Sequence, residues 1–61
     1  MNMTSQDYYL QGNVHRKNGD FALAMNAYME AIRLDKDSPA VEALKMLEHI
    51  MNFYHKDLYN P

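Results

Sequence analysis

The stretch that decides the fold is GDFALAMNAYMEAIRLD, residues 19–35. Its apolar residues recur every three or four positions, which is the period of one face of an α-helix; they are Phe21, Ala24, Met25, Tyr28, Ala31 and Ile32. Gly19 can take the left-handed conformation that ends a helix, and Asp20 can cap the free N–H groups of the next one. The stretch therefore predicts a tight turn followed by a helix over residues 20–34.

A second helix is expected before this turn, over residues 5–18. Thr4 and Asp7 are spaced so that a hydroxyl precedes an acidic side chain by three positions, which is close to the capping box that starts many helices. The two helices would then form a tight helical hairpin.

A third helix is expected after the hairpin, over residues 39–55. Ser38 is a candidate cap, and Pro39 suits the first helical position because its missing N–H costs nothing there. The apolar residues of this helix wrap more than one of its faces; they are Val41, Leu44, Met46, Leu47, Ile50, Met51 and Tyr54. The helix should touch two surfaces, and residues 56–61 would form an aromatic tail with Leu58 and Tyr59.

Composition bounds the class of protein. Sixty-one residues make one domain, over residues 1–61, whose core is thin. The chain has no cysteine, so disulfides cannot reinforce it and nothing indicates an oxidising compartment. We expect a cytoplasmic protein. The net charge of −2 argues against nucleic acid as a partner, and the apolar runs are too short to cross a membrane.

Chemical sites are not indicated by any motif. His49 and His55 are six positions apart, so they lie on opposite sides of a helix and do not form a metal pair. Asp35 and Asp37 resemble the opening of a calcium loop, but the later ligands are missing. No catalytic set or phosphate loop is present. We expect no enzyme activity, no cofactor and no metal. Helix-turn-helix DNA binding is disfavoured because residues 20–34 contain a single cation, Arg33.

Taken together, the spacing of small and aromatic residues resembles the tetratricopeptide repeat, a helix-turn-helix unit of about 34 residues. The residues that carry the resemblance are Tyr8, Gly12, Gly19, Phe21, Ala24, Tyr28 and Ala31. It implies an all-α fold of one repeat hairpin plus a C-terminal capping helix, as in a short bacterial single-repeat protein. Small residues are required where the two helices approach closely.

Three positions depart from the family pattern: Gln11 replaces a leucine, His15 replaces an aromatic residue and Lys36 replaces the closing proline. Apolar surface instead appears at Leu10 and Val14, and only residues 1–5 precede this helix. A shift by one repeat length finds no second repeat. Since a lone repeat is marginal, we expect a homodimer, with or without exchanged third helices. Its expected face comprises Leu10, Val14, Ile50, Met51 and Tyr54.

The resemblance implies a protein-interaction module whose first helix presents a groove to a protein or peptide partner. The groove positions are Gln6, Tyr9, Asn13, Arg16 and Lys17. Cations of the third helix, Lys45 and His49, could add to a site for an acidic peptide. The alternative is a purely structural protein that assembles with itself, without a peptide ligand, through its apolar faces and the aromatic residues near its C-terminus.

Overall fold

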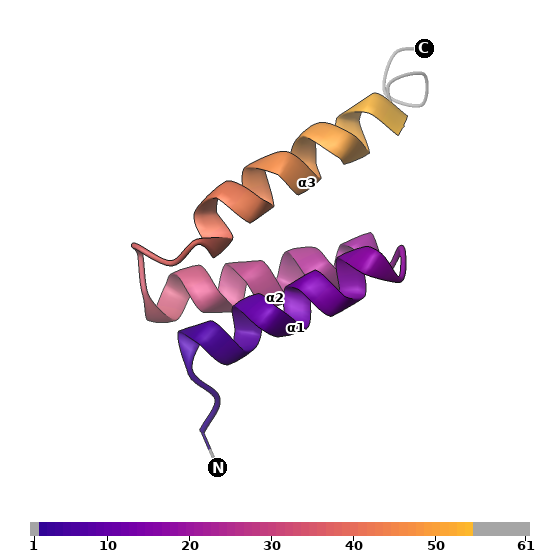
Figure 1. Ribbon diagram of the computed structural model, residues 1–61. Coiled ribbons are helices and arrows are strands. Elements are labelled where there is room, and N and C mark those ends of the chain that lie inside the picture. Colours follow the sequence, from indigo (N-terminus) through magenta and orange to yellow (C-terminus); the bar gives the residue numbers. More distant parts are fainter. Residues whose placement is uncertain (1, 55–61) are drawn as a thin grey trace.

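The structure is a computed structural model that describes residues 2–54, and the side chains of residues 2–52. It contains three helices: α1 (Ser5–Lys17), α2 (Phe21–Leu34) and α3 (Ala40–Tyr54). Figure 1 shows α1 and α2 side by side and antiparallel, with α3 running in the same general direction as α1 and diverging from the hairpin toward its C-terminal end. The expected three-helix, all-α fold is confirmed. The expected aromatic tail lies outside the described residues.

The start of α1 is fixed by the predicted capping box. The Asp7 N–H donates to Thr4 Oγ1 over 3.1 Å, and the Thr4 N–H donates to Asp7 Oδ2 over 2.9 Å. Both bonds satisfy backbone donors that a helix N-terminus leaves free. The hydrogen bond from the Thr4 backbone, followed by that with its side chain, also holds the pKa of the Asp7 carboxyl below its ordinary value.

The turn between α1 and α2 depends on Gly19. Its φ of 82° lies in the left-handed region that favours glycine, and the Asp20 N–H donates back to the His15 carbonyl over 2.9 Å. The expected capping by the Asp20 side chain is wrong: that side chain makes no cap hydrogen bond. The backbone ψ of Asp20 is 70°, against 168° at the functional cap Thr4, so Asp20 lacks the extended backbone that is typical of a capping residue.

The close approach of α1 and α2 depends on Gly12, which is buried against the ring of Tyr28. A Cβ atom at residue 12 would lie 2.6 Å from Cδ1 and Cε1 of that ring, nearer than non-bonded carbons approach. The ring itself is fully buried and cannot move aside without disturbing the core. The glycine therefore sets the distance between the two helices.

The packing of α3 on α2 uses small residues. Ala24 and Ala31 of α2 form a cluster with Ala40 and Leu47 of α3, and each of the four has 0% of its surface exposed. Small side chains let two helices come together, while Leu47 supplies volume. Large apolar side chains remain exposed on all three helices, among them Leu10, Leu23, Met29 and Met46, so much of each helix surface remains uncovered.

The connection to α3 is held by side-chain hydrogen bonds. The Asp37 N–H donates to Asp35 Oδ1 over 3.0 Å, and the Ala40 N–H donates to Ser38 Oγ over 3.1 Å. Ser38 thus caps the helix as its hydroxyl predicted. Pro39 lies in the turn immediately before Ala40. These bonds fix the N-terminal end of α3, where Ala40 packs with Ala24 and Ala31 of α2.

Candidate protein-interaction surface

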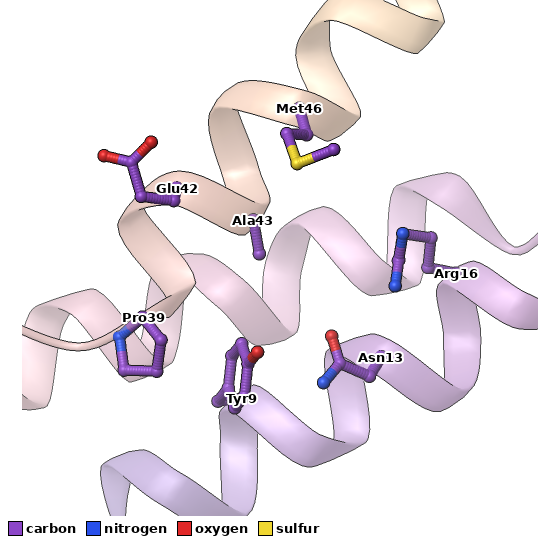
Figure 2. A pocket seen from close by; sticks show the side chains of 7 residues that line it. All are labelled: Tyr9, Asn13, Arg16, Pro39, Glu42, Ala43 and Met46. Carbon is purple, nitrogen blue, oxygen red and sulfur yellow. The ribbon is translucent and has the colours of Figure 1, made fainter.

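A hollow of about 270 Å³ lies between α1 and the first half of α3, and we refer to it as the α1–α3 hollow. Figure 2 shows side chains of α1 on one side and those of α3 on the other. It is lined by Tyr9, Asn13 and Arg16 from α1, Glu42, Ala43 and Met46 from α3, and Pro39. The hollow therefore combines an apolar wall with polar groups from α1.

Two of the α1 side chains in the hollow are held in place by Tyr28 of α2. The Tyr28 hydroxyl donates to Asn13 Oδ1, and the Tyr28 and Tyr9 rings are 6.1 Å apart between centroids with an interplanar angle of 38°, a favourable tilted arrangement. Because the Asn13 oxygen accepts this bond, its amide N–H₂ is the group that remains to donate to a ligand.

Arg16 provides the positive charge of the hollow. Its Nε atom is buried and has no hydrogen-bond acceptor among the residues that the structure describes. A buried donor without an acceptor costs free energy, and a guanidinium donates well to carboxylates. The only acidic side chain in the lining is Glu42, and Figure 2 shows its carboxylate directed away from Asn13 and Arg16. Arg16 is therefore suited to an acceptor brought by another molecule.

Three of the five predicted groove residues line this hollow, namely Tyr9, Asn13 and Arg16. The other two, Gln6 and Lys17, are exposed on α1 and do not line it. The predicted cations of α3, Lys45 and His49, surround a separate hollow of about 310 Å³ together with Met46 and Ile50. Met46 borders both hollows, so the two surfaces are continuous along α3.

Sequence reasoning missed the α3 side of the hollow, which consists of Glu42, Ala43 and Met46, and also missed the hydroxyl of Tyr28. The tyrosine carried a signal, because a buried phenol needs a hydrogen-bond partner and Asn13 lies on the facing helix. The α3 residues carried none, since the angle at which α3 leaves the hairpin is not encoded in its own periodicity.

The residues predicted to form an oligomer face are distributed over two helices. Leu10 and Val14 are 50% and 57% exposed on α1. On α3, Ile50 lines the second hollow, whereas Met51 packs against the core. The side chain of Tyr54 lies outside the described residues. Of the four predicted residues whose side chains the structure describes, Leu10 and Val14 are exposed, whereas Ile50 and Met51 are half-buried.

Residues 2–54 contain no group of three or more histidine, cysteine, aspartate or glutamate side chains placed to hold a metal ion. Among the helices that the structure describes, none is long and apolar enough to span a membrane.

Comparison with known families matches residues 8–38 to the tetratricopeptide repeat. The chain belongs to the tetratricopeptide repeat family. The match starts at Tyr8 and ends at Ser38, so it contains every residue on which the resemblance was based. Tetratricopeptide repeats are protein-interaction modules and are generally not enzymes. The repeat signature thus includes the buried positions of α1 and α2 with the exception of Ala27.

The repeat is also similar to a solved structure, the solution NMR structure of a Bacteroides fragilis protein. The two sequences are 54% identical, and the structures superpose with a TM-score of 0.83. The match covers 92% of this chain and 57% of the other, so the present chain spans little more than half the length of that protein. None of the curated proteins compared with the chain matches it.

Proposed function

We propose that this chain is a non-enzymatic interaction module that binds a short acidic segment of a partner protein in the α1–α3 hollow. The observation that carries the proposal is Arg16, whose buried Nε has no acceptor among the described residues. Asn13 lines the same hollow and has its amide N–H₂ left to donate, because its oxygen accepts from Tyr28. A carboxylate has two oxygens, so it can accept from the Asn13 amide and from the Arg16 guanidinium together.

The apolar wall of the hollow limits what else the partner segment contains. Met46 is 60% exposed and lies across the hollow from Tyr9 (Figure 2). Methionine adapts to differently shaped apolar groups, and a tyrosine ring packs against aliphatic side chains. The volume of about 270 Å³ is at the lower limit of ligand pockets. It suits one or two residues of a peptide, such as an acidic residue next to a leucine.

The experiment is an NMR titration of the ¹⁵N-labelled chain with a six-residue peptide of alternating leucine and glutamate that ends in a free carboxylate. We expect amide shifts at Asn13, Arg16, Ala43 and Met46, with a weaker response to the same peptide carrying a C-terminal amide. Arg16→Gln should remove most of the response, while Lys17→Gln, which changes an exposed neighbour outside the hollow, should keep it. Absence of shifts at Asn13 and Arg16 with the acidic peptide would rule the proposal out.

Self-association is the second candidate function, and the exposed apolar pair Leu10 and Val14 favours it. An exposed apolar pair on a helix is most simply buried against another helix. Under this second candidate function, the chain is a cytoplasmic scaffold that forms homodimers and binds neither nucleic acid nor a membrane. The net charge of −2 and the cysteine-free sequence support that setting.

The melting temperature tests self-association. A dimer that folds and associates together melts at a temperature that rises with protein concentration, whereas a monomer with a free hollow melts at a constant one. We expect a rise, accompanied by a mass in light scattering that exceeds that of one chain. A constant melting temperature with the mass of a single chain would contradict self-association and leave peptide binding unaffected.

A further inference from the structure

The outer surface of α1 carries an exposed apolar pair, Leu10 and Val14, and the inference drawn from it rests on the proposed self-association. Leu10 and Val14 are one helical turn apart and therefore share a face. Gly12, midway between them in the sequence, points toward α2 and contacts Tyr28, so Leu10 and Val14 face away from the hairpin. Their exposures of 50% and 57% agree with that direction. This outer face of α1 is accessible along its length.

Charged residues border the apolar pair in a symmetric way. Asp7 lies five positions before Gly12 and Lys17 lies five positions after it, just as Leu10 and Val14 lie two positions to each side. In an α-helix, Asp7 and Lys17 also lie about 40° to opposite sides of the line between Leu10 and Val14. Both are exposed. The acid engages Thr4 through Oδ2, and its Oδ1 remains to accept another bond.

We propose that this face binds a second copy of the same chain, with the two α1 helices antiparallel across a two-fold axis at the level of Gly12. In this arrangement Leu10 packs on Val14 of the second copy, and Asp7 lies at the same height as Lys17 of the second copy. Each contact occurs twice, as an isologous interface requires. A parallel arrangement would place like charges at the same height, which is unfavourable.

The size of the contact determines its strength. A single pair of helices buries less than the roughly 1,200 Å² at which stable protein interfaces begin. The dimer is therefore weak and depends on concentration. The α1–α3 hollow lies to one side of this face, since Leu10 and Val14 are absent from its lining. A peptide in the hollow and a second copy on the outer face can be bound together.

Disulfide trapping tests the orientation, and the natural chain contributes no cysteine of its own. Chains carrying Leu10→Cys and Val14→Cys are mixed in equal amounts and oxidised slowly. In the antiparallel dimer, the thiol of a Leu10→Cys chain lies opposite the thiol of a Val14→Cys chain. Two copies of the same variant place their thiols about 6 Å apart along the helix axis. We expect the mixed disulfide to exceed each homodimer by about threefold or more. A predominance of the two homodimers would overturn the antiparallel arrangement.

Charge variants test the surface itself. Lys17→Glu places like charges opposite each other, so the dissociation constant from sedimentation equilibrium should rise about tenfold or more. Lys36→Glu makes the same charge change in the exposed turn before α3. This control should change the dissociation constant of the dimer by no more than about twofold. If the Lys17→Glu and Lys36→Glu dimers are equally strong, self-association uses another surface. If the wild-type chain is a monomer, self-association itself is refuted.

Discussion

The α1–α2 hairpin and α3 are held by different means. Within the hairpin a single glycine sets the distance between the helices, because Gly12 lies directly against the buried ring of Tyr28. α3 is attached to α2 through alanines and one fully buried large residue, Leu47, with Leu44 and Met51 partly buried beside them. The side of α3 toward α1 borders a hollow. The hairpin is therefore defined by steric fit, and α3 by a small amount of buried volume. The candidate binding site lies where these two regions meet.

The largest effect is expected from closing the space at Gly12. Gly12→Leu should abolish the fold, because even a Cβ atom would lie 2.6 Å from the Tyr28 ring; for Gly12→Ala we expect a loss of about 1–3 kcal/mol. Circular dichroism during urea unfolding measures both. Gln11→Leu adds the same side chain at an exposed neighbouring position and should remain folded. A well-folded Gly12→Leu chain would show that the hairpin is not defined by steric fit.

Leu47→Ala should have the next largest effect on stability. It should affect α3 more than the α1–α2 hairpin. Leu47 is fully buried, and truncation of such a residue costs about 2–5 kcal/mol. Hydrogen exchange measured residue by residue should then show early exchange throughout α3 and slower exchange in α1 and α2. Met46→Ala, at a neighbouring exposed position, should change stability by no more than about 0.5 kcal/mol. Simultaneous loss of protection in all three helices would mean that the regions are not separable.

Tyr28→Phe should have an intermediate effect at the boundary of the two regions. It removes the hydroxyl that donates to Asn13 and should reduce stability by about 0.5–1.5 kcal/mol. The Asn13 side-chain amide should also lose its fixed orientation, seen as a change in its ¹⁵N relaxation. Tyr9→Phe removes a hydroxyl from the other ring of the pair and serves as the control. An unchanged Asn13 amide in the Tyr28→Phe variant would argue against this positioning role.

The hairpin could be predicted from the sequence because its determinants are local. The capping box at Thr4, the turn at Gly19 and the helical period from Phe21 each depend on neighbouring residues, and all three agree with the structure. Asp20 was the exception. Its identity favoured side-chain capping, but a backbone ψ of 70° did not permit it. That angle depends on how the turn closes against α1.

The candidate site could be predicted only on the α1 side. Asn13 and Arg16 follow from the repeat pattern, and both line the α1–α3 hollow. Lys45 and His49 were placed there by charge alone, but they line a hollow further along α3. The direction of α3 depends on how Ala40 and Leu47 pack on α2, and this is long-range information. Residue spacing within α3 does not contain it.

The turn that joins the two regions allows a prediction of increased stability. Asp35 has an extended backbone, with φ of −151° and ψ of 108°, which is the conformation that a following proline requires. Lys36→Pro should therefore stabilise the chain by about 0.4–1 kcal/mol by restricting the unfolded state. Thermal unfolding measures the gain. Asp37→Pro should destabilise it, because the Asp37 N–H donates to Asp35. A loss of stability with Lys36→Pro would contradict this reading of the turn.

The smallest effect is expected at the start of the hairpin, at acidic pH. Hydrogen bonds from Thr4 lower the pKa of Asp7 from its ordinary value of 3.8. The ionised Asp7 carboxylate therefore stabilises the folded chain fully above pH 3.8. This contribution is lost as the pH falls through the lowered pKa that Asp7 has in the folded state. The Thr4 and Asp7 amide shifts should follow this titration while that of Gly12, in the middle of α1 and without an acidic neighbour in the sequence, stays constant. Asp7→Asn should abolish this titration. A titration midpoint above 3.8 would contradict the lowered pKa of Asp7.

The short link between α1 and α2 also has a consequence for the order of folding. Contacts between helices that are neighbours in the chain form quickly, because little loop entropy opposes them. As a polypeptide emerges from the ribosome, its N-terminal elements fold first. The hairpin would then exist for a time with Ala24 and Ala31 of α2 uncovered, until Leu47 arrives. During synthesis, this face of α2 can contact another chain until Leu47 covers it.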